Sequence, residues 1–282
     1  IWGRETAFGS VKLPHDAIRV LATQAYIGQR KARFRPELIY ALKMLEDGIP
    51  RDKLRSSWAG AVGQTQFMPS DFYTHAADGD GDGVADLVNS IPDALMSAAN
   101  QLKNNGWVAG QPWGFEVVIP PTATCALEGP PDARPIGAWA KLGFVRVGGR
   151  KWKAAHLADE AYLMMPMGAY GPAFLAPQNF RAIRAYNTSD LYALFVGNLA
   201  DRIAGGGDFV TPWAAVAQPK TRTIEGVQAR LKDLGLPFEK IDGKIGSFTR
   251  RLIGQYQQSQ GLEVDCWPSD ALLRHAMETA AN

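Results

Sequence analysis

The sequence has little of several things, and each shortage excludes a class of protein. Its 30 basic and 28 acidic side chains leave a formal net charge of only +2, which is too small a surplus to indicate nucleic-acid binding. No run of about 18 apolar residues occurs, so the sequence predicts no transmembrane segment. The 4 histidines are scattered without the spacing of metal ligands, which argues against a histidine-based zinc site.

Cysteine is also scarce, since only Cys125 and Cys266 are present. A single pair cannot form the framework of a small disulfide-rich protein. The two residues lie far apart in the sequence, and cysteine is among the residue types that are most often buried. We therefore expect two free, buried thiols.

What is present is an ordinary globular composition, with 46% hydrophobic and 21% charged residues in a chain of 282 residues. Apolar residues recur at helical spacing over residues 16–30 and 91–105, and Pro36 is expected in the first turn of a further helix. Short apolar runs among prolines and glycines predict a β insertion at about residues 112–172. Helical spacing returns near Asn179. We expect an α+β protein that is mainly α.

The chain is long enough for more than one domain. Residues 206–221 contain the glycines and prolines of a flexible linker. They separate a large domain, residues 1–205, from a small helical domain, residues 222–282, which has its own apolar face.

One carboxylate, that of Glu5, stands among aromatic residues and glycines in the opening segment IWGRETAFG. Apolar surroundings penalise the charged form of a carboxyl group, so a glutamate there can hold its proton near neutral pH. Such a glutamate can donate that proton to a leaving oxygen. The alternative is a surface glutamate near the start of a helix.

A second segment, SWAGAVGQTQFMPS, begins at Ser57 and alternates small with large residues. The small residues let the backbone approach a ligand closely, and Ser57 and Gln66 can hydrogen-bond a neutral polar ligand such as an amide-bearing sugar. The large residues Trp58, Phe67 and Met68 suit a hydrophobic core equally well.

A third segment, AYNTSDLY, places Tyr186 and Tyr192 on either side of a predicted helix start. Tyrosine rings can stack on sugar faces while their hydroxyl groups form hydrogen bonds. Asn187 or Ser189 can alternatively cap the helix that follows.

The segment DGDGDGVADLVN, residues 78–89, matches the calcium-binding loop of an EF-hand. Its carboxylates repel one another unless a cation neutralises them. The predicted ligands are Asp78, Asp80, Asp82, the carbonyl of Val84, Asp86 and Asn89, with Asp93 as a ligand instead of, or besides, its role in a capping box that begins at Ser90. The last loop position holds Asn89 where a glutamate is usual, which predicts weaker binding. We expect a structural Ca²⁺ and no organic cofactor; a solvated acidic turn is the alternative.

Together these segments resemble the lytic murein transglycosylase B family, of glycoside hydrolase family 103 type, which has a lysozyme-like fold. The matching stretches, in the family's order, are IWGRETAFG, SSWAGAVGQTQFMPS, DGDGDGVADLVNS, SAANQLKNNGW and AYNTSDLYA. The resemblance implies cleavage of the β-1,4 bond between N-acetylmuramic acid and N-acetylglucosamine in peptidoglycan, with 1,6-anhydromuramyl ends as products. Glu5 matches the family's catalytic acid, which afterwards acts as base. The matches to positions that line the sugar cleft are Ser57, Gln66, Tyr186, Asn187 and Tyr192.

The small C-terminal domain resembles a three-helix peptidoglycan-binding domain. The matching stretches are IEGVQARL, which begins at Ile224, and DGKIGSFT, which begins at Asp242. Two positions depart from the family patterns. Asp265-Cys266 stands where Asp-Gly is usual, and Gln101 stands where the catalytic family has an aromatic residue, which predicts a weaker sugar subsite.

The resemblance also implies a place and a partner. We expect a monomer that acts on peptidoglycan glycan strands in the periplasm of a Gram-negative bacterium, and an outer-membrane anchor in a segment before Ile1 stays open. Two other functions stay open as well. One is a hydrolytic muramidase of the same fold, and the other is a catalytically silent peptidoglycan-binding protein.

Overall fold

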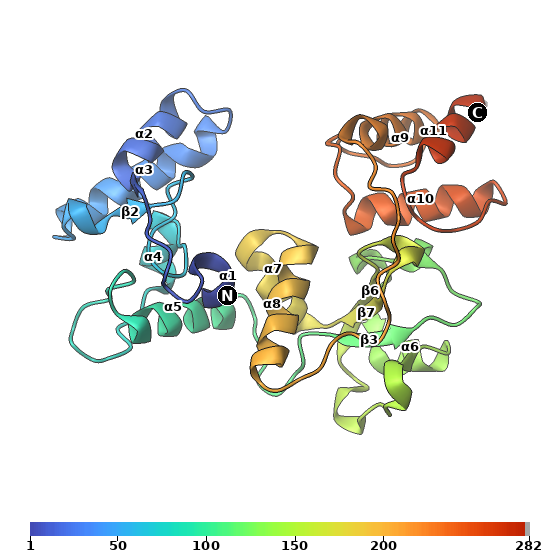
Figure 1. Ribbon diagram of the computed structural model, residues 1–282, viewed down its shortest axis with the longest axis horizontal. Helices are drawn as coiled ribbons and strands as arrows, with labels where there is room; N and C mark the ends of the chain where they lie inside the picture. The colour runs from blue at the N-terminus through green and yellow to red at the C-terminus, as the bar shows by residue number, and fades with distance from the viewer. Residues whose placement is uncertain (280–282) are drawn as a thin grey trace. The chain divides into compact units, whose positions relative to one another are not determined.

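The computed structural model describes residues 1–279, which form two compact units divided between Trp107 and Val108 (Figure 1). The chain is 48% helix and 9% strand, which confirms the predicted α+β class with mainly α content. None of the described helices combines the length and the apolar character that crossing a membrane would need.

The first unit packs helices around a small two-stranded antiparallel ribbon. Its helices are α1 (Trp2–Thr6), α2 (Ala17–Tyr26), α3 (Lys31–Glu46), α4 (Pro69–His75) and α5 (Ile91–Asn104), and its strands are β1 (His15–Asp16) and β2 (Arg55–Ser56). The carboxylate of Asp16 caps α2 by accepting the N–H of Arg19. Leu21 and Phe34 belong to the buried apolar cluster that α2 and α3 share.

Helix α3 begins earlier than its sequence predicts. It starts at Lys31, so Pro36 lies inside the helix and not in its first turn. A proline removes one helical hydrogen bond, and this loss is tolerated more easily near a helix start than in its middle. The contacts that α3 makes with α2 favour the longer helix.

The second unit is built on a five-stranded antiparallel sheet in the order β4-β6-β7-β3-β5. The strands are β3 (Phe115–Val118), β4 (Arg134–Pro135), β5 (Val145–Arg146), β6 (Glu160–Met164) and β7 (Ala173–Ala176), and the helices up to residue 205 are α6 (Ile136–Lys141), α7 (Gln178–Asn187) and α8 (Asp190–Ile203). Strand β7 lies just beyond the C-terminal bound that we set for the β insertion. Leu175 of this central strand faces Leu163 on one neighbour and Phe115 on the other.

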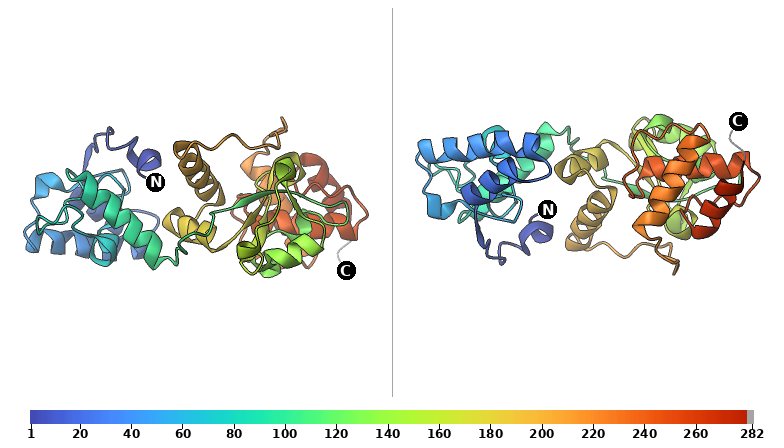
Figure 2. Two further views of the ribbon diagram at one scale, coloured as in Figure 1. Left: turned by 90° about the horizontal axis from the view of Figure 1, so that it is seen from below. Right: turned by 90° about the horizontal axis from the view of Figure 1, so that it is seen from above.

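The sequence predicts a separate small helical domain at residues 222–282, and in the structure its three helices belong to the same compact unit as the sheet. They are α9 (Thr221–Asp233), α10 (Ser247–Ser259) and α11 (Asp270–Glu278). Val227, Leu231 and Ile253 lie in the apolar core that these helices share. Figures 1 and 2 show the three helices against one side of the strand-rich part of the same unit.

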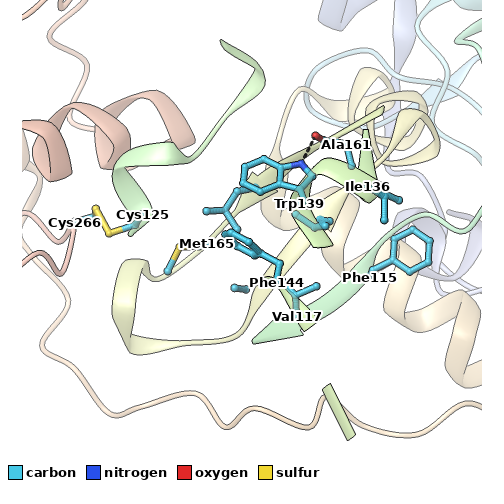
Figure 3. Packing of buried hydrophobic residues seen from close by; sticks show 12 residues of the cluster. Phe115, Val117, Cys125, Ile136, Trp139, Phe144, Ala161, Met165 and Cys266 are labelled. Atoms are coloured by element: carbon cyan, nitrogen blue, oxygen red, sulfur yellow. Dashed lines mark hydrogen bonds between the residues drawn. A yellow bond between two sulfur atoms is a disulfide. The ribbon is translucent and has the colours of Figure 1, made fainter. Parts of the chain in front are cut away.

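The two cysteines form a disulfide, so the expectation of two free thiols is wrong. Cys125 lies in a turn after β3 and Cys266 lies just before α11, and their Cα atoms are 6.1 Å apart despite a sequence separation of 141 residues. Both belong to one hydrophobic core with Trp139 and Phe144 (Figure 3). The pairing could not be deduced from sequence spacing because packing of the C-terminal helices on the strand-rich part brings the two residues together.

A buried ion pair forms a second connection between the same two parts of the unit. Nε and Nη2 of Arg250, on α10, donate to the carboxylate of Glu128 at 2.8 and 2.5 Å. Glu128 is 0% exposed and Arg250 is 2% exposed. The backbone N–H of Met165 donates a further hydrogen bond to Glu128, at 2.9 Å. This two-bond geometry offsets part of the cost of removing both charges from water.

Residues 206–221 contain no helix or strand before α9 begins, but hydrogen bonds attach this segment to the strand-rich part. The N–H groups of Val210 and Thr211 donate to the carboxylate of Glu116 at 2.9 and 2.6 Å. Further along, the N–H of Ala214 donates to a backbone carbonyl of the strand-rich part. Composition predicts a flexible linker, whereas these hydrogen bonds hold the segment in place.

Candidate active site

Glu5 lies on α1, a five-residue helix that one glutamine holds in place. Nε1 of Trp2 donates to Oε1 of Gln64 at 2.9 Å, and Oγ1 of Thr6 donates to the carbonyl of Gln64 at 2.6 Å. Gln64 in turn donates from Nε2 to the carbonyl of Val88 at 3.0 Å. Residues on both sides of Glu5 are therefore fixed to the predicted sugar-binding segment.

Sequence reasoning missed Gln64. The segment contains two glutamines in GQTQF, and only Gln66 was singled out as a ligand. The role of Gln64 depends on a partner 62 residues away in the sequence, so no local pattern could assign it.

Glu5 is half-buried, and the glycines of the opening segment let the aromatic rings of that segment pack closely. The rings of Trp2 and Phe8 meet edge to face, with centroids 5.5 Å apart. A Cβ on Gly3 would lie 2.6 Å from the ring of Phe8. Gly9 has φ +78°, and a Cβ there would lie 2.4 Å from the side-chain oxygen of the anchoring glutamine. The aromatic and glycine residues of the opening segment therefore pack against one another and against the side chain of Gln64.

Ser57 and Gln66 lie on one tightly folded loop. The N–H of Ser57 donates to the carbonyl of Ala61 at 2.9 Å. Nε2 of Gln66 donates to the carbonyls of Gly63 and Ala61, at 3.1 and 3.4 Å. These bonds orient the amide of Gln66. Phe67 is fully buried in the core, in line with the alternative that large residues of this segment serve packing, whereas Trp58 is 65% exposed and does not.

Five non-glycine residues of the described chain have positive φ: Ala7, Phe8, Gln66, Thr188 and Cys266. Ala7 and Phe8 follow Glu5 closely, Gln66 is itself a predicted ligand, and Thr188 follows Asn187. Each such residue costs about 1 kcal/mol, and backbone strain of this kind concentrates at functional sites. Four of the five thus lie at or beside the predicted site residues. The sequence alone could not reveal these positive φ values.

The acidic loop brings three of its predicted ligands together. One carboxylate oxygen from each of Asp78, Asp80 and Asp93 lies within 4.8 Å of the others. Asp93 is fully buried and accepts the N–H groups of Gly79 and Asp86 at 2.8 and 2.7 Å. An all-oxygen set of this kind suits a hard cation such as Ca²⁺, which would relieve the repulsion among the carboxylates. The residues present therefore fit the ion.

Asp82 and Asp86 lie outside this three-carboxylate cluster. Asp82 accepts the N–H of Val84 at 2.8 Å. Asp86 pairs with Nζ of Lys53 at 2.8 Å and accepts the side-chain amide of Asn89 at 2.9 Å. Burial opposes ionisation of Asp86, but these hydrogen bonds outweigh it and lower its pKa to about 2.

Ser90 caps α5, as predicted, because its Oγ accepts the N–H of Asp93 at 3.3 Å. The N–H of Ser90 donates to the carbonyl of Asp86 and not to Asp93, so the reciprocal bond of a capping box is replaced. The Asp93 carboxylate serves the acidic loop instead. Gln101, which stands at the position expected to be aromatic, is buried on the same helix.

The remaining sugar-binding candidates belong to the second unit. The rings of Tyr186 and Tyr192 are stacked, with centroids 6.2 Å apart and an interplanar angle of 13°. Helix α7 ends at Asn187, and Ser189 caps α8 by accepting the N–H of Tyr192 at 3.3 Å. The capping role therefore falls to Ser189, and Asn187 is exposed.

Comparison with known families gives two matches along the chain. Residues 1–201 match the family model of the transglycosylase SLT domain, and residues 223–273 match that of a peptidoglycan binding domain. The membrane-bound lytic murein transglycosylase B of Escherichia coli strain K12 is 30% identical over 210 residues, which cover 72% of this chain and 55% of that protein. The chain thus spans about half the length of this curated relative.

Solved structures of similar proteins extend the comparison. SltB3 of Pseudomonas aeruginosa in complex with NAG-anhNAM-pentapeptide superposes with a TM-score of 0.90 at 42% identity, covering 98% of this chain and 74% of that chain. The Escherichia coli lytic transglycosylase Slt35 in complex with calcium has a TM-score of 0.60 at 29% identity, covering 72% of this chain and 64% of that chain. These similarities confirm the lysozyme-like fold expected from the sequence.

Proposed function

Because the chain belongs to the family of transglycosylase SLT domains, we propose that it is a lytic transglycosylase that cleaves the β-1,4 bond between N-acetylmuramic acid and N-acetylglucosamine in peptidoglycan. The observation that carries this proposal is the anchoring of the Glu5 helix to Gln64 on both sides of the carboxylate. Such anchoring is what a proton donor needs, since proton transfer requires a side chain held at a fixed distance from the reacting oxygen.

In the proposed reaction Glu5 first acts as an acid and then as a base. It donates its proton to the glycosidic oxygen as the bond from that oxygen to C1 of the muramyl residue breaks. The C6 hydroxyl of the same residue then bonds to C1 and returns a proton to Glu5, which closes a 1,6-anhydro ring. The N-acetyl group of the substrate assists at C1, so no second carboxylate is needed. No water is consumed.

The other site residues have supporting roles in this proposal. Ser57 and Gln66 hydrogen-bond the sugar amides and hydroxyls, and Tyr186, Asn187 and Tyr192 bind the sugar rings by stacking and hydrogen bonds. The ring of Tyr186 is stacked on that of buried Tyr192, so Tyr186 is the ring of the pair that can offer a face to a sugar.

The functional division is part of the same proposal. Residues 1–205 form the catalytic domain, residues 206–221 link it to the next domain, and residues 222–282 bind the wall. Residues 280–282 lie outside the described part of the chain. The family match over residues 223–273 supports the wall-binding role.

The proposed Ca²⁺ is structural, and the Slt35 complex with calcium supports it. Asp78, Asp80 and Asp93 would hold the ion, and the further ligands predicted from the loop are Asp82, the carbonyl of Val84, Asp86 and Asn89. A bound cation would neutralise the clustered charge and stabilise the loop before α5.

The proposed location is the periplasm of a Gram-negative bacterium, where the chain acts as a monomer on glycan strands. The similarity to a membrane-bound transglycosylase of Escherichia coli supports action at the cell wall. The Cys125–Cys266 disulfide also supports it, because disulfides persist in oxidising compartments such as the periplasm and are rare in the cytosol.

The test is the product chemistry of purified sacculi, followed by mass spectrometry, with a Glu5→Gln variant beside the native chain. Anhydromuropeptides are expected from the native chain and none from Glu5→Gln, which keeps its melting temperature. Glu46→Gln, at an exposed glutamate near the end of α3, is the control and keeps full activity. Equal anhydro product from Glu5→Gln rejects the mechanism. Reducing ends indicate a hydrolase, and sacculus binding without any soluble fragment indicates a silent binding protein.

A further inference from the structure

A cavity of about 430 Å³ lies in the second unit, at the edge of the sheet. Its walls come from β3 and β5, from residues 150–156, from the end of α8 and from residues 206–210. None of the predicted sugar-binding residues lines it, and the proposed reaction does not use it. The cavity therefore raises the question of what it binds.

One wall of the cavity is cationic. Arg146, Arg150 and Lys153 come from a single stretch of chain, and no ion pair joins any of them to an acidic group within residues 1–279. Nε of Arg146 is buried and has no hydrogen-bond partner among the described residues. Burial lowers the pKa of Arg146, and the like charge of Arg150 adds to this effect. A buried donor of this kind is costly unless a ligand satisfies it.

The acidic groups of the cavity wall are engaged elsewhere. Glu116 accepts two backbone N–H groups of the connecting segment, at 2.9 and 2.6 Å. Asp201 accepts Nε1 of Trp113 at 2.7 Å, and Asp208 pairs with Arg202. None of these carboxylates pairs with the cationic wall in the described structure, so Arg146, Arg150 and Lys153 are available to an anionic ligand.

The cavity is built from parts that hold one another in place. The guanidinium of Arg146 lies 5.2 Å from the ring centroid of Phe115, and its residue pairs with Val117 across the sheet. Elsewhere in the lining Phe209 packs against Phe174, with ring centroids 5.0 Å apart. A preorganised wall loses little side-chain freedom when a ligand binds, which favours affinity.

We propose that this cavity binds the carboxylate of a peptide, with Arg146 and Arg150 as its guanidinium ligands and Lys153 at the rim. Guanidinium groups bind carboxylates through two parallel hydrogen bonds, and the half-buried ring of Phe209 in the same lining can contact a peptide side chain. The choice of peptide rests on the proposed function. The related SltB3 structures contain a sugar linked to a pentapeptide, and a linear peptide ends in a free carboxylate.

The test measures binding without turnover. The full chain carrying Glu5→Gln is titrated calorimetrically with a synthetic pentapeptide that has a free terminal carboxylate, and then with the same peptide as its terminal amide. The peptide acid is expected to bind, and the amide to bind at least about tenfold more weakly, because charge-assisted hydrogen bonds are lost.

The variants localise the binding. Arg150→Gln combined with Lys153→Gln is expected to weaken binding of the acid at least about tenfold. Both residues are exposed, so the fold should persist, as circular dichroism would check. Lys151→Gln is the matched control, since Lys151 is exposed in the same stretch but does not line the cavity, and it should leave binding unchanged. Arg146→Met is a second variant that is expected to weaken binding of the peptide acid.

Three results would overturn the inference. They are no binding of the peptide acid, equal binding of acid and amide, and equal effects on binding of Lys151→Gln and the double variant Arg150→Gln, Lys153→Gln. The inference and the proposed function fail separately. If the native chain makes anhydro products but the rim variants bind peptide normally, the cavity assignment is wrong and the activity stands. If peptide binding depends on the arginines but no product forms, the activity is wrong and the cavity assignment stands.

Discussion

Nε1 of Trp2 donates a hydrogen bond of 2.9 Å to Oε1 of Gln64, and this bond joins the helix of the proposed catalytic acid to the loop of the proposed sugar ligands. Thr6 donates to the backbone carbonyl of the same glutamine. One residue thus fixes the first and last residues of α1. The position of Glu5 therefore depends on a side chain that takes no part in proton transfer.

Trp2→Phe tests this dependence, because it removes the indole N–H and keeps an aromatic ring beside Phe8. We expect kcat to fall about tenfold with little change in KM, since a misplaced acid affects the chemical step more than binding. The free energy of unfolding should fall by only about 1 kcal/mol. Steady-state kinetics on soluble glycan strands and denaturant unfolding measure both quantities.

Gln64→Leu and the double variant complete this prediction as a mutant cycle. If the hydrogen bond acts as described, the double variant loses less activity than the sum of the two single variants. Trp213→Phe is the control for an exposed tryptophan outside the stretches that match the family, and its kcat should equal that of the native chain. Additive losses in the cycle would show that Trp2 and Gln64 act independently.

Calcium should raise the melting temperature of the chain. A ligand that binds only the folded state stabilises it, by about 2.7 kcal/mol when its concentration is a hundred times its Kd. Asp80→Asn should abolish the response, because it removes one carboxylate of the three-carboxylate cluster. Asp52→Asn, at an exposed acid outside the loop, should keep it. Differential scanning calorimetry with Ca²⁺ and with a chelator measures the effect, and a melting temperature indifferent to both would exclude the site.

The buried pair of Glu128 and Arg250 should be costly to break. Arg250→Met leaves an unpaired buried carboxylate and should lower the free energy of unfolding by about 3–5 kcal/mol. Adding Glu128→Leu to it should restore much of that loss, because no buried charge then remains. Arg181→Met removes an exposed ion pair with Glu160 and should cost at most about 1 kcal/mol. Equal costs in urea unfolding for the buried and the exposed pair would contradict the structure.

The disulfide should stabilise the second unit. Replacing both Cys125 and Cys266 with serine is expected to lower the free energy of unfolding by about 2–4 kcal/mol, since the bond restricts the unfolded chain. A reductant should destabilise the native chain and leave the double serine variant unaffected. Thermal unfolding with and without reductant provides the comparison, and equal sensitivity of the two proteins would mean that the bond contributes nothing.

The stacked tyrosines should act on substrate binding more than on chemistry. Tyr186→Ala removes one ring of the stack and should raise KM by about threefold to tenfold with a smaller change in kcat. Tyr186→Phe keeps the ring and should retain most of the affinity, unless the hydroxyl group is the main contact. Kinetics on glycan strands separate the two cases, and a KM unchanged in both variants would remove Tyr186 from the binding site.

Local patterns were sufficient for much of the fold. The cap at Ser90 and the C-terminal helices follow from helical spacing and capping residues that lie close together in the sequence. The start of α3 was misplaced because a proline marks the first turn of many helices, whereas here contacts with α2 extend the helix before Pro36. A boundary set by tertiary contacts is not visible in a local pattern.

The structure explains how Cys266 is accommodated at a position where the family pattern has glycine. It stands where glycine is usual, and its φ of +55° is a backbone conformation that glycine adopts without cost. The local turn therefore keeps positive φ despite the substitution. The covalent bond to Cys125 and the surrounding core hold the residue there.

By itself the sequence determined the mainly helical class, the acidic loop and the small C-terminal module, because each depends on residues close together in the chain, and it offered Glu5 as the candidate acid. Only the tertiary structure decided the hydrogen bonds from Trp2 and Thr6 to Gln64, the disulfide, the Glu128–Arg250 pair and the cationic cavity. These features join residues that are many positions apart, with no spacing rule to connect them. Packing of whole elements brings such residues together, and the free energy of that packing is spread over the entire core.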